Sequence, residues 1–228
     1  MFKDVANNSL LNPRLKLSVD SNHEIATILS FIDNVIGNFR SYYIDQGSPY
    51  RENRISDLLV NYLQYHKSQL SDGFWPFDFR KNPTQPSSGK ETDIGVFFIA
   101  LNTHPLVPII EFEAKRLSNK SNRTPHNTEY VYGERGGMER FKRGEHSPHL
   151  IECGMFGYIQ NRNANYWVDK INNWIEDVQA KSDLDWSNEK EFLAFSQNIL
   201  TVSKYSSENK RARDLPSIKL WHYMLDLS

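Results

Sequence analysis

The sequence predicts a single α/β domain in which helices flank a mixed central sheet and extra elements lie at both ends. Three observations predict this class. Two amphipathic helix patterns come first, an apolar hairpin follows between residues 92 and 117, and helices then alternate with strands toward the C-terminus. That order is typical of a mixed sheet covered by helices. The 228 residues suffice to bury one sizeable core, so we expect one domain over residues 1–228.

The first predicted helix starts at Ser21, with Glu24 three residues later in a capping-box arrangement. Apolar residues follow at helical spacing as far as Phe39, and the Gly-Ser-Pro sequence at 47–49 ends the pattern. The second helix has one apolar face, and Glu52 lies at the edge of that face. The face consists of Ile55, Leu58, Leu59, Tyr62 and Leu63.

The hairpin pairs a strand at 92–101 with a strand at 106–117 through a turn at 102–105. Residues 72–90 before it are typical of a loop with one short strand, and residues 118–130 after it are typical of a loop. Beyond the hairpin we expect, in order, a helix at 136–143, a strand at 151–159, helices at 167–178 and 192–200, and a strand at 218–227.

Composition restricts the class of protein. A hydrophobic content of 39% and a charged content of 24% argue against disorder, and no apolar run approaches the roughly 20 residues of a membrane span. Residues 1–17 lack the apolar core of a signal peptide. The single cysteine, Cys153, excludes an internal disulfide and is expected to be a small buried residue. We therefore expect a cytoplasmic protein with no membrane partner.

Charge is unevenly distributed in a chain whose formal net charge is −1. Between Lys115 and Arg143 there are eight Lys or Arg residues against three Glu residues. Such a stretch is either a phosphate-binding surface or an ordinary solvated surface, and charge alone does not separate the two.

The second strand of the hairpin ends unusually, because it runs directly into Glu111, Glu113 and Lys115. Side chains alternate along a strand, so these three share one side while Phe112 and Ala114 share the other. Charged groups at the end of a buried strand are costly unless they are paired or bound to metal.

Asp93 begins the partner strand, across the hairpin from Glu113. Two carboxylates that converge there suit a hard cation such as Mg²⁺, with Mn²⁺ as a substitute. A bound metal would polarise a phosphate and activate a water molecule. Lys115 would orient that water or stabilise the charge that develops at phosphorus. An ion-pair cluster with a structural role alone is the alternative interpretation.

The pattern of Asp93, then nineteen residues, then Glu113-Ala114-Lys115 resembles the PD-(D/E)XK superfamily of restriction-endonuclease-like nucleases. The resemblance implies a core of a helix, three strands, a helix and a strand, covering roughly residues 50–165. It also implies that Glu52, on the preceding helix, completes the metal site, although a Glu in a first helical turn also stabilises the helix dipole. Thr92 stands where the family motif has proline.

Two other acidic positions carry less weight. A second Glu-x-Lys triplet, Glu208-Asn209-Lys210, lies in a polar stretch without a partner carboxylate, and we discount it. Glu111 is on the face of Glu113 but one strand step away, so a supporting or surface role fits it as well as metal binding.

The helix expected at 136–143 supplies the predicted nucleic-acid contacts. Arg140 and Arg143 are three residues apart on one face, and Lys142 and Arg135 extend the basic region. Backbone amides at the Gly136-Gly137 pair are candidates for a phosphate site. The alternative is an ordinary amphipathic helix. The seven histidines show no metal-ligand spacing, and we expect surface or hydrogen-bonding roles for them, His146 and His149 included.

The resemblance implies a Mg²⁺-dependent deoxyribonuclease in which Asp93, Glu113 and Glu52 hold the metal, Lys115 is the catalytic lysine and water attacks phosphorus. Analogy further suggests a bacterial restriction or phage-defence effector that works as a homo-oligomer or with an activating protein partner. Two alternatives stay open: a module that keeps the fold without cutting, and a nuclease directed at RNA.

Overall fold

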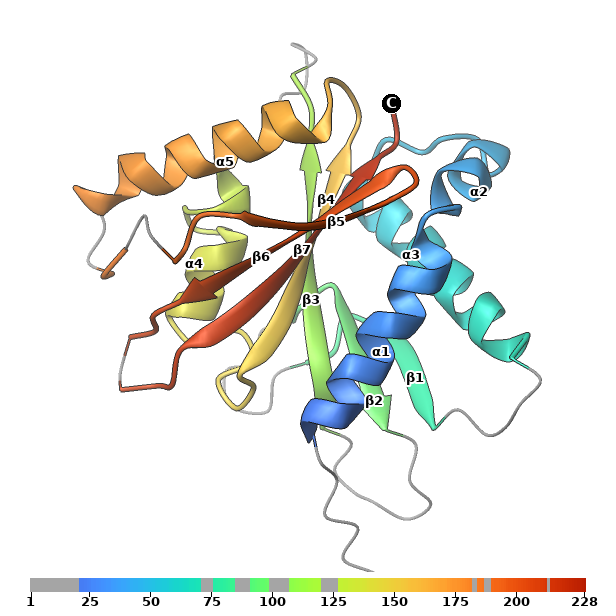
Figure 1. Ribbon diagram of the computed structural model, residues 1–228, viewed down its shortest axis with the longest axis horizontal. Coiled ribbons are helices and arrows are strands. Elements are labelled where there is room, and N and C mark those ends of the chain that lie inside the picture. Colours follow the sequence, from blue (N-terminus) through green and yellow to red (C-terminus); the bar gives the residue numbers. More distant parts are fainter. Residues whose placement is uncertain are drawn as a thin grey trace, which may run out of the picture.

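The strands that the structure describes belong to one mixed sheet with helices on both of its faces (Figure 1). The computed structural model describes residues 21–70, 76–84, 91–98, 107–119, 127–181, 184–186, 190–212 and 214–228. The seven strands follow the order β1-β2-β3-β4-β7-β6-β5. The predicted α/β class with a mixed, helix-flanked sheet is therefore confirmed. None of the described helices combines the length and apolar character that crossing a membrane requires.

In the described part of the chain, three helices precede the sheet: α1 (Ser21–Ile36), α2 (Phe39–Asp45) and α3 (Glu52–Ser68). The predicted continuous helix through Phe39 is wrong, because the structure interrupts it at Gly37. A Cβ atom on Gly37 would lie 3.0 Å from the Leu200 side chain, and the Gly37 carbonyl accepts a hydrogen bond of 3.0 Å from the Thr201 hydroxyl. A distant turn therefore packs against the chain where the helical pattern alone would continue.

The predicted hairpin is present in shortened form, and it belongs to an antiparallel meander. That meander consists of β1 (Phe77–Lys81), β2 (Ile94–Phe98) and β3 (Pro108–Leu117). The turn expected at 102–105 lies outside the described residues. The segment expected as a loop at 118–130 contains a short 3-10 helix, η1 (Asn127–Tyr130).

Strands β4 and β7 continue the sheet parallel to β3. The helix α4 (Gly137–Lys142) leads into β4 (Glu152–Ile159), which pairs parallel with both β3 and β7 (Ile218–Asp226). The helix α5 (Ala164–Gln179) follows β4. These elements confirm the predicted helix, strand and helix order from residue 136 to residue 179 and the final strand.

The helix expected at 192–200 is wrong, because this segment is the start of a β-hairpin. The hairpin consists of β5 (Ala194–Ile199) and β6 (Val202–Asn209). Leu200 takes a positive φ of 52° at the turn between them. Every residue of β6 pairs with β7, from Val202 opposite Leu225 to Asn209 opposite Ile218. Sheet pairing thus overrides the helical spacing of the apolar residues in this segment.

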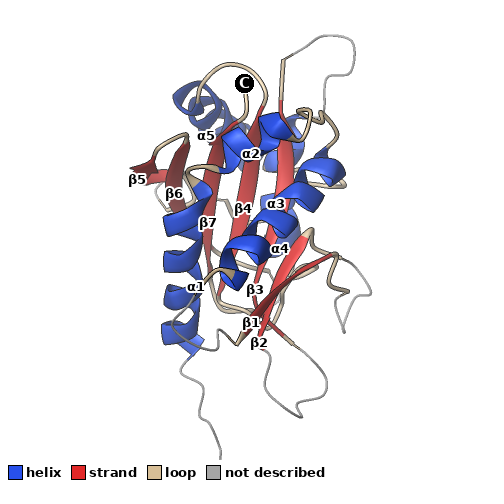
Figure 2. Cartoon of the chain, turned by 90° about the vertical axis from the view of Figure 1, so that its right-hand side faces the viewer, coloured by secondary structure: helices blue, strands red, loops and turns tan. Residues whose placement is uncertain are grey.

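The sheet separates two apolar cores. Helices α1, α2 and α3 cover one face, seen in Figure 2, and pack against Phe112 and Ala114 of β3. Helices α4 and α5 cover the other face, where Met155 and the buried Cys153 lie. Glu111, Glu113 and Lys115 of β3 alternate with Phe112 and Ala114 and are buried as well. The predicted division of β3 into an apolar side and a charged side is therefore confirmed.

Close packing behind β3 makes Gly154 a sensitive position. A Cβ atom there would overlap the ring of Phe112, which stacks on Phe156 at a centroid distance of 4.9 Å. We expect Gly154→Ala to lower the free energy of unfolding by roughly 1–3 kcal/mol, because overpacking forces the ring to move. Urea unfolding measures this change. The double variant Gly154→Ala/Phe112→Leu should lose less than the sum of its single variants. A wild-type urea midpoint for Gly154→Ala would contradict the packing described.

Candidate active site

Strand β3 is longer than its neighbour β2, and this mismatch positions two carboxylates. The pairing of β2 with β3 reaches Ile94 opposite Phe112, whereas β3 continues to Leu117 along β4. Beyond Phe112, Asp93 Oδ2 accepts a hydrogen bond of 2.7 Å from the backbone N–H of Ala114. Glu52 Oε2, at the first residue of α3, accepts one of 2.7 Å from the N–H of Arg116. The two side chains serve as acceptors where the strand partner has ended.

Glu113 lies among three basic side chains. Its Oε1 is 2.8 Å from Lys115 Nζ and 3.4 Å from Arg140 Nη1 of α4. Its Oε2 is 3.5 Å from Nε2 of His146, a residue in the loop after α4. Only 3% of the Glu113 side chain is exposed to solvent. Lys115 and Arg140 therefore hold Oε1, and Oε2 faces the imidazole of His146, in a site largely removed from water.

Burial and mutual repulsion shift the pKa values of the acids. Burial raises the pKa of Glu52, of Asp93 and of Glu113, and for Glu113 the pKa reaches about 7 with the help of the Asp93 charge. Lys115 opposes this rise at all three carboxylates. Burial by itself would lower the pKa of Lys115, yet the charges of Glu113, Glu52 and Asp93 outweigh burial and raise it. The site therefore contains a stable ammonium group and an excess of acids that additional positive charge would stabilise.

The two carboxylates suit a Mg²⁺ ion that keeps several water ligands, and they are too few for a site made of protein ligands alone. No group of three or more His, Cys, Asp or Glu residues within the described ranges is arranged to hold a metal ion. Mg²⁺ is commonly held by one or two carboxylates and keeps several water ligands. Asp93 and Glu113 are buried oxygen donors, and the charge of Asp93 raises the pKa of Glu113. A cation between them would offset that repulsion, whereas Glu52 is engaged with the Arg116 amide.

Glu111 supports the site from a buried position. Its Oε1 accepts a hydrogen bond of 3.2 Å from the hydroxyl of Thr92, and its Oε2 accepts one from the hydroxyl of Ser147. Thr92 directly precedes Asp93, so Glu111 connects the start of β2 to the loop before β4. Thr92 therefore helps to hold the backbone next to Asp93.

The basic residues that were predicted to contact nucleic acid lie in different surroundings. Arg140 faces the carboxylates, and its charge lowers the pKa of Asp93 and Glu113 against the effect of burial. Arg143 Nη2 instead donates to Glu139 Oε1 at 3.1 Å, and Arg135 lies exposed on a turn. A hollow of about 330 Å³ beside Arg140 and Arg143 is also lined by Glu134, Glu139 and Glu145. Of the basic residues in this region that the sequence singled out, Arg140 is the one at the carboxylate cluster.

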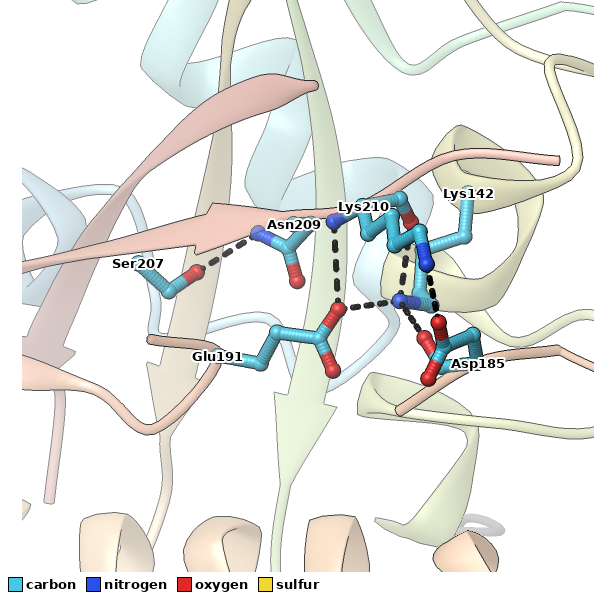
Figure 3. Close-up of polar contacts among 6 residues, drawn as sticks. All are labelled: Lys142, Asp185, Glu191, Ser207, Asn209 and Lys210. Atoms are coloured by element: carbon cyan, nitrogen blue, oxygen red, sulfur yellow. Dashed lines mark hydrogen bonds and ion pairs between the residues drawn. The ribbon is translucent and has the colours of Figure 1, made fainter. Parts of the chain in front are cut away.

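Lys142 was expected among these contacts, and the structure contradicts that expectation. Its side chain is fully buried, forms an ion pair with Glu191 and donates hydrogen bonds of 2.9 Å to the carbonyls of Asp185 and Lys210 (Figure 3). Its ammonium group lies 4.5 Å from the centroid of the Trp186 ring. Burial lowers the pKa of Lys142 against the pull of Glu191. A six-residue helix packed on the sheet turns this lysine toward protein, so it is unavailable to phosphate.

The glycine pair at the start of α4 is also unsuited to a phosphate. Gly136 and Gly137 are buried, and a Cβ atom on Gly137 would lie 3.1 Å from the sulfur of Met155. The nearby N–H of Gly133 donates to Glu139 Oε2 at 2.8 Å. These glycines allow close packing, and the N–H of Gly136 donates to the carbonyl of Gly133 at 2.9 Å, which argues against the phosphate site expected there.

His146 is the site residue that the sequence gave no means of finding. Its side chain is fully buried, and its ring meets that of Phe141 edge to face at a centroid distance of 5.6 Å. It lies 33 positions after Glu113 in the chain, with no spacing pattern that connects them. Only the packing of α4 on β3 brings the imidazole to Glu113.

Comparisons of this chain with protein-family models, with curated proteins and with solved structures return no match.

The raised pKa of Glu113 makes a prediction about stability. The carboxyl ionises near pH 4.5 in the unfolded chain and near pH 7 in the fold. The folded state therefore binds more protons in this window, and its stability falls as pH rises from about 4.5 to about 7. We expect a loss of roughly 2–3 kcal/mol in the free energy of unfolding over this range without divalent cations.

Urea unfolding at several pH values, in the presence of a chelator, measures this loss. Glu113→Gln is the matched control, because glutamine keeps the shape of the side chain but cannot ionise. The decline should be clearly smaller in this variant. An equal decline in the wild type and in Glu113→Gln would show that another group titrates.

Proposed function

We propose that this protein is a metal-dependent nuclease with a PD-(D/E)XK-like core that hydrolyses phosphodiester bonds of DNA. The observation that carries the proposal is the convergence of Asp93, Glu113 and Lys115 from two neighbouring strands. Lys115 Nζ lies 2.8 Å from Glu113 Oε1, and the pKa of Lys115 responds to the charge of Asp93 as well as to that of Glu113. Asp93 and Glu113 are twenty residues apart in the sequence, and the pairing of β2 with β3 brings them close together.

The order of the elements supports the same proposal. From Glu52 to Ile159 the described chain runs through a helix, three strands, a helix and a strand, namely α3, β1, β2, β3, α4 and β4. This is the order that the resemblance implies for residues 50–165. Asp93 lies just before β2, Glu113 and Lys115 lie in β3, and Glu52 starts α3, which supports the proposal.

The residues of the site have distinct roles in the proposed reaction. Asp93 and Glu113 would hold Mg²⁺ or Mn²⁺, with Glu52 close by, and the bound ion would polarise the phosphate and lower the pKa of a water molecule. Lys115 remains protonated beside the carboxylates and stabilises the negative charge that develops at phosphorus. Arg140 adds a second positive charge. Glu111 holds Thr92, next to Asp93, in place, and His146 borders Glu113.

Water is the nucleophile in this proposal, so hydrolysis forms no covalent intermediate with the protein. The P–O bond to the leaving oxygen breaks as the bond from water to phosphorus forms, and the leaving oxygen takes up a proton. DNA is the proposed substrate by resemblance, with restriction or phage defence as the proposed biological setting. The phosphate chemistry at the site is common to DNA and RNA.

Cleavage assays test the proposal directly. Plasmid and single-stranded DNA are incubated with the protein and Mg²⁺ or Mn²⁺, and Lys115→Ala and Glu113→Gln are compared with the wild type. We expect each variant to lose at least about a hundredfold in cleavage rate, because each removes charge stabilisation or a metal ligand. An RNA of the same sequence tests the alternative substrate.

The second Glu-x-Lys triplet provides a matched control. Lys210 is largely exposed and pairs with Asp185 away from the site, so Lys210→Ala should cut like the wild type. Cutting that survives in Lys115→Ala and Glu113→Gln would reject the assignment of the site. A protein that binds metal and DNA without cutting would favour the non-catalytic alternative.

A further inference from the structure

A pocket at the start of α3 adjoins the proposed active site. It has a volume of about 450 Å³ and is lined by Tyr50, Arg51, Glu52, Asn53, Arg54 and Arg116. We propose that this pocket binds an unpaired nucleotide of the substrate strand next to the bond that is cut. This inference rests on the proposed nuclease function and names the form of substrate that the site takes.

The pocket and the carboxylate cluster share residues. Glu52 lines the pocket and accepts the hydrogen bond of 2.7 Å from the Arg116 backbone. Arg116 directly follows Lys115 in β3, and its side chain donates to the carbonyl of Tyr50 at 3.1 Å. Lys115 and Arg116 point to opposite sides of β3, and Glu52 at the edge of the strand links the two, because it responds to the charges of Lys115, Asp93 and Arg116. A strand bound at the cluster therefore passes this edge to reach the pocket.

The charge of the pocket suits a phosphate. Among the described residues, three arginines line it against one carboxylate. Arg51 is exposed, and the side chain of Arg54 is 68% exposed although it lies 3.5 Å from Asp57. Both guanidinium groups can therefore turn toward a phosphate oxygen. The start of a long helix adds its favourable dipole for an anion.

Tyr50 supplies an aromatic surface in a fixed position. Its carbonyl accepts hydrogen bonds of 3.1 Å from Arg116 and from Gln160, while 45% of the residue stays exposed. The guanidinium groups of Arg51 and Arg116 each lie 5.9 Å from the ring centroid. A base can stack on such a ring while its phosphate contacts the arginines. A base inside a duplex is already stacked on its neighbours, so the ring favours an unpaired nucleotide.

A second hollow serves as a comparison for the charge and the aromatic lining of the pocket at α3. The described residues of its lining are Asp185, Lys190, Glu191, Glu208, Lys210 and Ser217, among which acids outnumber bases and none is aromatic. Glu208 pairs with Lys219 at the start of β7, whereas Tyr50 contacts Gln160 beyond the end of β4. The two hollows therefore lie at opposite ends of the parallel strands. Lys190 and Lys210 are largely exposed and provide a matched pair for charge removal.

The test measures binding without cutting, in the presence of a chelator. A short fluorescein-labelled single-stranded DNA and the same sequence as a duplex are titrated with protein and followed by fluorescence anisotropy at several salt concentrations. We expect Arg51→Ala/Arg54→Ala to bind the single strand roughly tenfold more weakly and to reduce the slope of log K against log salt by about 1.4, from about 0.7 for each phosphate contact. The control Lys190→Ala/Lys210→Ala removes the same charge and should retain the wild-type slope.

Tyr50 separates stacking from charge. Tyr50→Ala should weaken single-strand binding by about tenfold and leave duplex binding unchanged, and Tyr50→Phe should bind like the wild type. Because these side chains are exposed, the thermal midpoints of all the variants should stay near that of the wild type.

The proposal is overturned if the arginine pair and the lysine pair change affinity and salt slope equally, or if Tyr50→Ala weakens duplex binding as much as single-strand binding. Either result in a protein whose cutting depends on Lys115 leaves the nuclease proposal intact. A wild type that binds neither probe overturns this inference, and the cleavage assay then decides the nuclease proposal separately.

Discussion

Strand β3 continues from Glu113 to Leu117 after its pairing with β2 has ended at Phe112. The backbone N–H groups of Ala114 and Arg116 then lack a neighbouring strand, and buried amides without acceptors are costly. Asp93 and Glu52 provide those acceptors. The contacts that complete the sheet edge also bring both carboxylates to Lys115. Local fold and candidate site thus follow from one mismatch in strand length.

The same arrangement places three acids in surroundings that disfavour their charged forms. Burial raises the pKa of Glu52, Asp93 and Glu113. Lys115 opposes the rise at all three, with Arg116 at Glu52 and Arg140 at Asp93 and Glu113, but incompletely. A divalent cation would complete the balance and make full ionisation favourable. By contrast, Lys142 and Glu191 on the far side of α4 form a buried ion pair. The Lys142 ammonium group also donates to two backbone carbonyls. The charges of this pair are therefore balanced within the protein, whereas those of the acids in the candidate site are not.

The sequence pattern was sufficient to predict those elements whose structure depends on their own residues. The face of α3, the alternation along β3 and the placement of Asp93 opposite Glu113 all follow from period and hairpin geometry. The pattern gave wrong predictions where contacts with distant segments determine the structure. The β5–β6 hairpin depends on pairing with β7, and the break at Gly37 depends on Leu200. Side-chain surroundings were harder still, since helical spacing alone cannot tell that Lys142 and His146 are buried or that Tyr50 borders Arg116.

Metal binding is the direct test of whether the cluster of Asp93, Glu113 and Lys115 is an active site. Isothermal titration calorimetry with Mn²⁺ or Mg²⁺ would compare the wild type with Asp93→Asn, in which the amide oxygen can still accept from the Ala114 N–H. The wild type should bind the ion and release protons near pH 7, where Glu113 is partly protonated, and Asp93→Asn should lose that binding with its fold intact. Equal binding by both proteins, or none by the wild type, would contradict the account and leave the cluster with a structural role.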